Sequence, residues 1–324
     1  MIYIESESTD PTWNLAMEEF LFTHLPQGTE CLFLWQNDRT IVVGKNQNTR
    51  EEVNEDYISK NQIRVVRRLS GGGAVYHDLG NLNYTFIADR EKGIDFHRFC
   101  EPLIDALRSF GLETCLSGRN DLLLDGKKFS GNAQYFGADR VLHHGTILFS
   151  SDLGVLTKAL RPDPGKIKSK GIRSVSSRVT NLAPYLPEGT TIRDLKTRLA
   201  ERFSPLELLE LTQTDRDWIA RRKRERYDTW EWNYGSSPPY EFHTRNRIEG
   251  CGTLEIQFSA DQGVISDLRI RGDFFGVKEI RAVEALLIGC QCNRLEIIKR
   301  LREISLEEYI MGLSPEVLAG LLTR

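Results

Sequence analysis

The chain has 324 residues with 40% hydrophobic content, which is enough for a substantial core and favours two domains. Its formal net charge of -3 argues against general nucleic-acid binding, because the phosphates require a basic footprint. The six scattered cysteines are typical of reduced cytosolic thiols, and neither a signal peptide nor a membrane-spanning run is visible. These features predict a soluble, cytoplasmic protein.

The beginning of the chain alternates predicted strands and helices. A short strand is expected at residues 2–4, and Asp10-Pro11 predicts the start of a helix that runs to about His24. The elements expected next are a pair of strands at residues 31–35 and 40–44, a helix at residues 51–60 and a buried strand at residues 63–66.

The following residues add more strands than helices. The pattern predicts a strand at residues 81–88 and a core-facing helix at residues 96–110. A hairpin is expected from LLLD and KKFSGNAQYFGA, and TILFS predicts a further strand. The combination predicts a mixed β-sheet with interspersed helices, which is an α/β (α+β) fold.

A basic segment separates this region from the rest of the chain. Residues 161–182, RPDPGKIKSKGIRSVSSRVTNL, carry six basic residues and little apolar periodicity. A loop of this length is usually a lid, a binding loop or a disordered linker. Beyond it we expect helices at residues 190–203 and 215–227, capped at Thr190 or Thr191 in the first case.

The last part of the chain predicts a small α+β domain. Aromatic residues, glycine and two prolines at residues 230–247 predict a partly packed boundary and then a linker. The elements expected after it are a hairpin at residues 252–272 and helices at residues 279–288, 293–302 and 314–322. The predicted division is a catalytic domain at residues 1–245 and an accessory domain at residues 246–324.

The segment RRLSGGGAVYHDLGN, residues 67–81, is the centre of the predicted site. Two arginines at the end of a strand precede Ser70, Gly71, Gly72 and Gly73, which we call the glycine loop. Glycines let a ligand lie directly on the backbone, and free N–H groups beside guanidinium charge suit an anion. The glycine triplet alone fits a plain turn equally well, and it is neither a Rossmann fingerprint nor a P-loop.

Further polar clusters follow on other loops: Asn120-Asp121, Lys127-Lys128 with Ser130-Gly131, and the basic residues 166–178. Each has an ordinary structural explanation, such as a turn, a hairpin tip or a solvated linker. Arg67 and Arg68 fit surface arginines, and His144 fits a core histidine. Together the clusters form a set able to hold ATP, Mg²⁺ and a carboxylate substrate. No Ser-His-Asp, Cys-His or paired-His metal motif is visible.

Four linked motifs then point to one family. RRLSGGGAVYHDLGN, GRNDLLLDGKKFSGNAQ, HHGTILF and KGIRSVSSRVTNL occur in this order, and with them the chain closely resembles the lipoate-protein ligase A family over residues 1–245. The resemblance implies a mixed-sheet catalytic domain similar to that of biotin-protein ligases, followed by an accessory domain. It also implies that ATP converts lipoate to lipoyl-adenylate, with release of pyrophosphate, before the lipoyl group passes to a lysine of a carrier domain.

The resemblance implies a role for the residues around the glycine loop. Arg68, Ser70, Gly71, Gly72 and Gly73 would lie along the lipoyl-adenylate. Val75, His77 and Asn81 would border the acyl chain or the adenine, and His144 and Gly145 would line the lipoyl tunnel.

It also implies roles for the hairpin and the basic segment. Lys128, in the family's K-x-S-G-x-A pattern with Gly131, would be the catalytic lysine that binds the acyl carbonyl and the phosphate. Asn120 and Asp121 would hold the phosphate side, with Asp121 as a Mg²⁺ ligand. The adenylate-binding loop would contain Lys170, Gly171, Ser174 and Arg178.

The implied cofactors are ATP and Mg²⁺, with lipoate as substrate. The implied partners are the lipoyl domains of 2-oxoacid dehydrogenase E2 subunits and the glycine cleavage H protein, served by a monomeric enzyme.

Three alternatives stay open at this point. A lipoyl or octanoyl transferase of the same superfamily would use a cysteine to form an acyl-thioester. The loop Arg119-Asn120-Asp121 has no cysteine, and Cys115 is expected to be buried. A biotin ligase and a non-catalytic lipoate-binding protein are the others. The basic loop favours the ligase over the transferase, and the sequence RRLSGGG differs from the glycine loop of biotin ligases. Lys128, Asp121 and the basic loop weigh against a non-catalytic protein.

Overall fold

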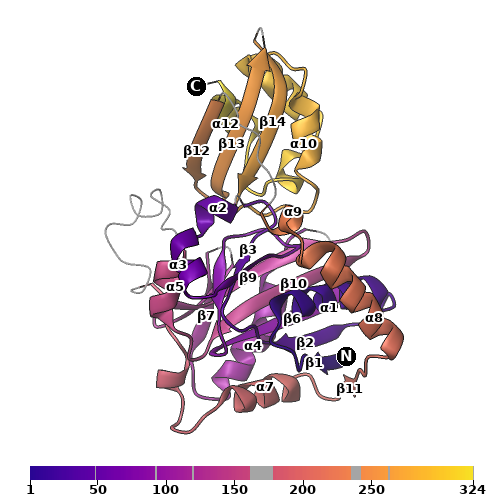
Figure 1. The fold of residues 1–324 in the computed structure, drawn as a ribbon, viewed down its shortest axis with the longest axis vertical. Helices are drawn as coiled ribbons and strands as arrows, with labels where there is room; N and C mark the ends of the chain where they lie inside the picture. Colours follow the sequence, from indigo (N-terminus) through magenta and orange to yellow (C-terminus); the bar gives the residue numbers. More distant parts are fainter. Residues whose placement is uncertain are drawn as a thin grey trace.

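The computed structural model describes residues 1–47, 49–91, 93–118, 120–160, 178–234, 242–261 and 263–323. It has a large N-terminal part and a small C-terminal part that sits on one end of it (Figure 1). None of the helices in these described ranges is long and apolar enough to cross a membrane.

An eight-stranded mixed sheet forms the centre of the large part, in the order β11-β1-β2-β6-β10-β9-β8-β7. Its strands are β1 (Ile2–Glu5), β2 (Cys31–Trp35), β6 (Asn81–Asp89), β7 (Thr114–Ser117), β8 (Asp121–Leu124), β9 (Lys127–Phe136), β10 (Arg140–Leu148) and β11 (Glu207–Leu208). Strand β1 runs parallel to β2 and β11, and the other neighbours are antiparallel. The expected mixed α/β fold and the hairpin of β8 and β9 are confirmed.

A second, three-stranded sheet carries the glycine loop. It contains β3 (Thr40–Val43), β4 (Arg64–Arg67) and β5 (Val75–His77), in the order β4-β3-β5. The expected pairing of residues 31–35 with residues 40–44 is therefore wrong, because β2 pairs with β1 and β6 whereas β3 pairs with β4 and β5. Both runs are buried on every residue, so their composition carries no alternation that would assign them to a common sheet.

Helices cover both faces of the large sheet. The helices of the large part are α1 (Pro11–His24), α2 (Thr49–Glu52), α3 (Glu55–Lys60), α4 (His97–Arg108), α5 (Leu153–Ala159), η2 (Ala183–Tyr185), α7 (Ile192–Glu201), α8 (Gln213–Arg222), the π-helical turn η3 (Lys223–Tyr227) and α9 (Trp230–Asn233). One core lies between the sheet and helices α4 and α7, with Phe86 and Leu103 among its members. The other core joins α1 and α8 to the opposite face of the sheet and to the three-stranded sheet.

Two helix predictions need correction. The single helix expected at residues 51–60 is two short helices, because Val53 pairs with Leu160 and the Asn54 side chain caps α3. The helix expected at residues 215–227 begins at Gln213 and ends in the turn η3. The helix starts predicted at Asp10-Pro11 and at Thr191 are confirmed by their side-chain caps.

The C-terminal part has a separate core under its own three-stranded sheet. It contains β12 (Phe242–Ile248), β13 (Gly252–Asp261), β14 (Val264–Gly272), α10 (Arg281–Leu287), α11 (Arg294–Leu301), η4 (Leu306–Glu308) and α12 (Pro315–Leu322). The hairpin and the three helices are confirmed. Strand β12 lies within the stretch expected as a linker; its sequence, FHTRNRI, is mostly polar and it is an edge strand, so no apolar alternation marks it.

Candidate functional site

One face of the large sheet carries a line of side chains that crosses four strand boundaries. Trp35 is the register partner of Asn83, Asn83 of Thr146, and Asp121 of Gly131. The Gly131 N–H donates to Thr146 Oγ1 at 3.3 Å, which joins the two halves of the line. Register partners point to the same face of a sheet, so Trp35, Asn83, Thr146, Gly131 and Asp121 form one row, which we call the site row.

The hairpin of β8 and β9 places a charged pair at one end of the site row. Lys128 Nζ lies 2.7 Å from Asp121 Oδ1, and both side chains are half-exposed. A Cβ on Gly131 would lie 2.8 Å from Lys128 Nζ, so the glycine leaves room for the ammonium group above the sheet. The Lys128 backbone is fixed by residues 178–180, because its N–H donates to the Arg178 carbonyl at 2.8 Å and its carbonyl accepts from Thr180. Lys128, Asp121 and Gly131 are thus brought together as expected.

Asn120 supports the loop beside the charged pair through two hydrogen bonds to Asn132 of β9. Its Nδ2 donates to the Asn132 carbonyl at 2.6 Å, and the Asn132 side chain donates back to the Asn120 carbonyl at 3.1 Å. These two bonds hold the turn that carries Asp121 into β8. The structure thus places Asn120 next to the charged pair as a support for its loop.

Arg68 lies inside the glycine loop. Its side chain is buried, with Nε donating to Ser70 Oγ at 3.0 Å. The remaining guanidinium nitrogens donate to the carbonyls of Val42, Gly71 and Gly73 at 3.1, 2.7 and 2.9 Å. Burial lowers the pKa of Arg68 to about 10, so it stays charged at neutral pH. Arg68 therefore fixes the shape of the loop.

Arg67 is not the surface arginine that its sequence context allows. Its buried guanidinium donates to the carbonyls of Gly44 at 2.9 Å and Gln47 at 2.8 Å, and to Thr49 Oγ1 at 2.6 Å. It also donates to the carbonyls of Trp232 and Asn233 in α9. Arg67 thus ties the loop after β3 to the end of the large part.

A chain of buried hydrogen bonds leads from the glycine loop to the sheet. Ser70 Oγ lies 2.6 Å from His144 Nε2, and His144 Nδ1 lies 2.8 Å from Glu18 Oε1. A carboxylate oxygen accepts, so the His144 proton belongs on Nδ1 and Nε2 accepts from the Ser70 hydroxyl. Thr85 donates to the same Glu18 oxygen at 2.6 Å, and the Trp35 indole donates to Thr85 at 3.0 Å.

Sequence reasoning missed three members of this chain: Glu18, Trp35 and Thr85. Glu18 lies on α1 and is 1% exposed, although its position fits the helix pattern of a solvated carboxylate. The adjacent Glu19 is also buried, where it pairs with Arg222 and Arg226. Two adjacent glutamates among Leu15, Phe20 and Leu21 were the available signal, because charged side chains are seldom buried without partners.

His77 faces the same region from β5. Its Nδ1 lies 3.2 Å from Asn37 Nδ2, and Asn37 Oδ1 already accepts from Asn14, so His77 Nδ1 accepts and the proton sits on Nε2. His77 Nε2 has no hydrogen-bond partner. Burial, followed by the positive charge of Arg68, lowers the pKa of His77 to about 3. The imidazole is therefore neutral at physiological pH.

This depressed pKa predicts acid sensitivity. Below pH 6.5 His77 is protonated in the unfolded chain but stays neutral in the folded protein. The free energy of unfolding therefore falls as the pH drops from 6.5 toward 3. Between pH 7.5 and pH 5 we expect His77 to contribute a loss on the order of 2 kcal/mol. Urea unfolding at the two pH values should show a smaller loss for His77→Gln than for wild type. The exposed His97→Gln should match wild type, and a His77→Gln variant with an unchanged pH dependence would contradict the assignment.

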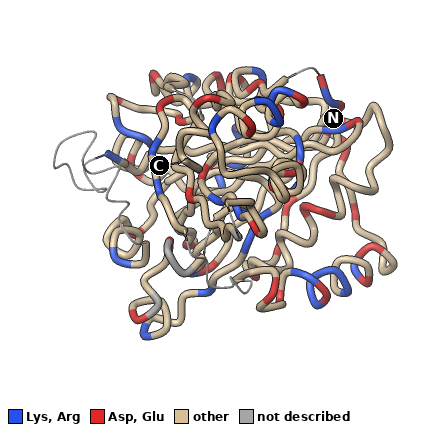
Figure 2. Tube along the Cα trace, turned by 90° about the horizontal axis from the view of Figure 1, so that it is seen from above, with Lys and Arg blue, Asp and Glu red and all other residues tan. Residues whose placement is uncertain are grey.

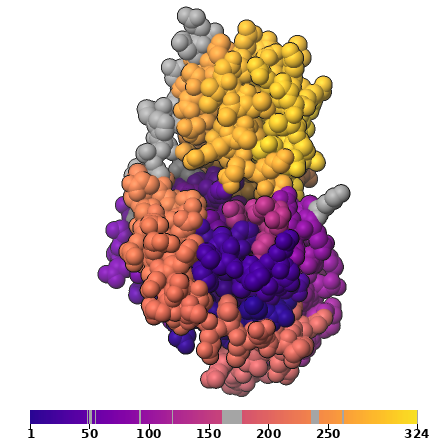
Figure 3. Space-filling view, turned by 90° about the vertical axis from the view of Figure 1, so that its right-hand side faces the viewer, coloured from indigo at the N-terminus to yellow at the C-terminus, as the bar shows by residue number. Residues whose placement is uncertain are grey.

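The C-terminal part lies directly on the glycine loop. The Gly72 N–H points at the Phe274 carbonyl, 3.4 Å away, and a Cβ on Gly71 would lie 2.5 Å from the same oxygen. The buried ring of Phe275 packs against Phe96 at a centroid distance of 5.5 Å. In the space-filling view the yellow C-terminal part rests on the indigo and magenta segments below it (Figure 3). One loop N–H group is thus directed at the C-terminal part.

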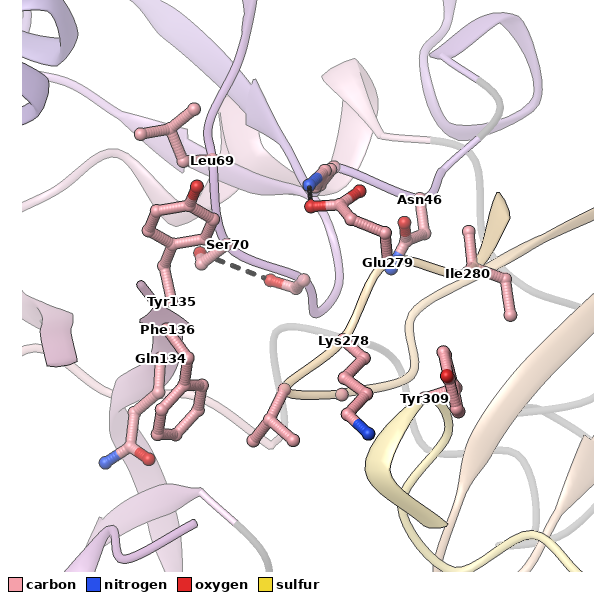
Figure 4. A pocket seen from close by; sticks show the side chains of 14 residues that line it. Asn46, Leu69, Ser70, Gln134, Tyr135, Phe136, Lys278, Glu279, Ile280 and Tyr309 are labelled. Carbon is pink, nitrogen blue, oxygen red and sulfur yellow. Dashed lines mark hydrogen bonds and ion pairs between the residues drawn. The ribbon is translucent and has the colours of Figure 1, made fainter. Parts of the chain in front are cut away.

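A pocket opens where the two parts meet. Leu69 and Ser70 line it from the loop, Gln134 to Phe136 from β9, and Lys278 and Glu279 from the C-terminal part (Figure 4). Lys45 pairs with Glu279 across the pocket.

Charges of both signs are interspersed along the chain when it is seen from above the C-terminal part (Figure 2).

The other predicted residues have the following places. Val75 is half-buried on β5, and Asn81 is buried on β6, where its amide donates to Asn83 Oδ1 at 2.9 Å. A Cβ on Gly145 would point at Tyr84 and Asn132, on the face opposite the site row. Arg178 precedes Thr180 beside Lys128, whereas Lys170, Gly171 and Ser174 lie outside the described residues. Among the residues that the structure describes, no group of three or more His, Cys, Asp or Glu side chains forms a metal site.

Comparison with protein families gives two matches. Residues 10–204 match the family model described as the lipoyl protein ligase A/B catalytic domain. Residues 237–322 match the model described as the bacterial lipoate protein ligase C-terminus. The lipoate-protein ligase LplJ of Bacillus subtilis is 40% identical over 326 residues, which cover 98% of each chain.

Solved structures similar to this chain include lipoate-protein ligases. The Plasmodium falciparum LipL1 in complex with lipoate matches 99% of this chain and 98% of its own, with a TM-score of 0.82 and 26% identity. A lipoate-protein ligase A bound with ATP matches 72% of this chain and 97% of its own, with a TM-score of 0.63 and 27% identity. The bipartite ligase of Thermoplasma acidophilum, studied with its E2 lipoyl domain, matches 74% and 98%, with a TM-score of 0.64 and 28% identity.

Proposed function

The chain belongs to the lipoate-protein ligase family, and from this premise we propose that the reaction is centred on Lys128 at one end of the site row. The enzyme activates lipoate with ATP to lipoyl-adenylate, releases pyrophosphate, and passes the lipoyl group to a lipoyl carrier domain. The observation that carries the placement is the Lys128–Asp121 pair above Gly131, at the half-exposed end of a row whose opposite end, at Trp35 and Asn83, is buried.

The first step needs charge stabilisation more than proton transfer. A lipoate carboxylate oxygen attacks the α-phosphorus of ATP, an O–P bond forms, and the bond to the departing pyrophosphate breaks with its electron pair. Negative charge gathers on the phosphoryl oxygens in the transition state. An ammonium group that touches both the acyl oxygen and the phosphate stabilises that state more than it stabilises the bound substrates. Lys128 has three N–H donors, so it can keep Asp121 and still bind both groups.

Asp121 fits the role of a single carboxylate ligand for Mg²⁺. Mg²⁺ is commonly bound through one or two carboxylates together with substrate phosphates, and Asp121 is a half-exposed carboxylate beside the proposed phosphate position. When bound, the ion would neutralise phosphate charge. Asp121 itself orients Lys128 through the 2.7 Å contact.

The glycine loop is proposed to follow the bound acyl-adenylate. Arg68 binds the carbonyls of Gly71 and Gly73, which fixes the backbone of the loop. N–H groups of such a loop can bind phosphate oxygens. Ser70 and His144 would line the acyl end, and Val75, His77 and Asn81 would border the acyl chain or the adenine. Asn120 and residues 170–178 complete the proposed set, and Gly145 is left out of it because its Cβ position faces the opposite side of the sheet.

The second step requires no protein nucleophile. The acceptor lysine amine attacks the acyl carbonyl, an amide bond forms, and AMP leaves with the electrons of the mixed anhydride bond. The amine proton passes to solvent. Glu18, Ser70 and His144 are spaced like a Ser–His–carboxylate triad, but Ser70 is 1% exposed and its oxygen accepts from Arg68. We propose that these three residues position the loop and the acyl group.

The cysteine-dependent rival can be tested on Cys115. Contrary to expectation Cys115 is exposed, because it lies on the edge strand β7. We expect wild type and Cys115→Ala to form lipoyl-adenylate and release pyrophosphate equally in the presence of ATP, Mg²⁺ and lipoate. Mass spectrometry of the mixtures without acceptor measures this. A covalent acyl adduct on Cys115 with an acyl-carrier donor, lost in the variant, would instead assign a transferase.

The carrier proteins are proposed to be 2-oxoacid dehydrogenase E2 subunits and the glycine cleavage H protein. We also propose that the chain acts as a monomer in the cytoplasm, where its six free thiols would stay reduced. We also propose a catalytic domain and an accessory domain, with the boundary moved from residue 245 to a point before β12, because Phe242–Ile248 pairs with β13 of the C-terminal part.

A further inference from the structure

At the end of the site row away from Lys128, the amino group of a buried amide has no hydrogen-bond partner. Asn83 is 1% exposed, and its Oδ1 accepts from Asn81 Nδ2 at 2.9 Å. Asn83 Nδ2 has no hydrogen-bond partner, nor has Asn81 Oδ1. The structure puts the unpaired amino group on Asn83; exchanging the nitrogen and oxygen of both amides would move it to the adjacent Asn81 and leave Asn83 Oδ1 unpaired. Buried polar groups are normally paired, so this gap points to a bound ligand.

The unpaired amino group lies on the sheet face that carries the site row, where the substrate is proposed to bind. Asn83 sits in the site row between Trp35 and Thr146, on the side of the sheet opposite Tyr84 and Phe86. The ring of Trp35 also contacts His77, at a centroid distance of 6.2 Å, and His77 Nε2 is the second unpaired N–H donor here. Two donors without acceptors thus flank the same indole.

The distance from Lys128 matches an eight-carbon chain. Lys128 Nζ lies over Gly131, and Asn83 is two strands away through Thr146. Adjacent strands are about 4.8 Å apart, so Asn83 lies roughly 10 Å from Gly131 along the row. Seven carbon–carbon bonds of about 1.5 Å in a zigzag span about 9 Å. A chain whose carboxyl group is held by Lys128 therefore ends near Asn83.

We propose that Asn83 is a specificity-determining residue that favours acyl chains with a hydrogen-bond acceptor at their far end, and therefore selects lipoate over octanoate. This inference rests on the proposed position of the carboxyl group at Lys128. The ring sulfurs of lipoate are weak acceptors that can pair with the Asn83 N–H group. An octanoyl chain has only C–H groups at this position. It would displace water from the Asn83 N–H group without accepting a hydrogen bond in its place.

Kinetics with two acids would test the inference. Asn83→Leu keeps a similar side-chain volume and removes the amide, and Thr146→Val removes a polar group one strand nearer Lys128. We expect wild type to prefer lipoate over octanoate by about tenfold in kcat/KM for pyrophosphate release. Asn83→Leu should reduce this preference to within about threefold, chiefly by raising kcat/KM for octanoate, whereas Thr146→Val should leave the ratio near that of wild type.

A substrate series on wild type tests the inference even if Asn83→Leu fails to fold. We expect 6-thiaoctanoate, with one sulfur in the chain, to have a kcat/KM between those of octanoate and lipoate. Equal values for octanoate and lipoate in wild type would overturn the inference, as would an Asn83→Leu variant that is active with an unchanged ratio. Wild type that released pyrophosphate with neither acid would overturn the placement of the reaction as well.

Discussion

Lys128→Ala is expected to lower kcat for adenylate formation by about 10³-fold while the protein stays folded. The ammonium group is needed where negative charge develops, between the acyl oxygen and the phosphate. Removing one preorganised donor of this kind typically costs two to three orders of magnitude. Pyrophosphate release, measured with saturating ATP and lipoate, gives the rate.

The structure predicts a small effect of the same change on stability. The Lys128–Asp121 pair is half-exposed, and such ion pairs contribute at most about 1 kcal/mol. The backbone bonds of Lys128 to residues 178 and 180 do not depend on its side chain. Urea unfolding should therefore give nearly equal midpoints for wild type and Lys128→Ala.

Lys127→Ala is the matched control. Lys127 is the exposed neighbour on the same strand, and its side chain points to the opposite face of the hairpin. We expect its kcat to stay within about threefold of wild type. If both variants lost activity to the same extent, general charge near the site would explain the loss, and the specific role of Lys128 would be refuted.

The sequence predicts the parts of this site that are local. The charged pair lies on one hairpin, and the turn residues between LLLD and KKF mark it clearly, so Asp121, Lys128 and Gly131 could be placed relative to one another. The glycine loop was likewise recognisable, because it lies between two short strands. Strand pairing beyond the hairpin, by contrast, was partly misassigned, because β2 and β3 are equally apolar.

The long-range partners were not predictable from the pattern. Ser70 and His144 are 74 residues apart, and His144 and Glu18 are 126 residues apart. No spacing rule joins them, because only the crossing of α1 over β6 and β10 brings Glu18 to the sheet. The contact of Phe274 with the glycine loop depends on how the C-terminal part is seated, which no local signal encodes.

The contacts of Arg67 and Arg68 were also not predictable from the sequence, although the two residues are adjacent. Arg67 is the last residue of β4 and Arg68 follows it in extended pairing with Val43, so their side chains point to opposite faces. Arg67 accordingly reaches α9 and the segment after β3, and Arg68 reaches into the glycine loop. The two guanidinium groups therefore stabilise different parts of the structure.

Arg68→Lys is expected to lower kcat/KM for lipoate by about 10²-fold. A guanidinium has five N–H donors in a fixed plane, and Arg68 uses that fork to hold three carbonyls and Ser70 Oγ at once. A lysine offers a point charge on a flexible stem and cannot span the same acceptors. A loop displaced by about 1 Å is enough for a loss of this size.

Arg67→Lys is the control for Arg68→Lys. It also removes a buried guanidinium, but it leaves the contacts of the glycine loop in place. Both variants leave buried carbonyls short of donors, so each should lose about 2–4 kcal/mol of stability in urea unfolding. The contacts of Arg67 lie outside the glycine loop, and we expect its kcat/KM for lipoate to fall by no more than about tenfold. Equal activity losses in the two variants would mean that global destabilisation, and not the shape of the glycine loop, controls the rate. A loss of kcat/KM that is much larger in Arg68→Lys than in Arg67→Lys would show that Arg68 preorganises the glycine loop for substrate binding.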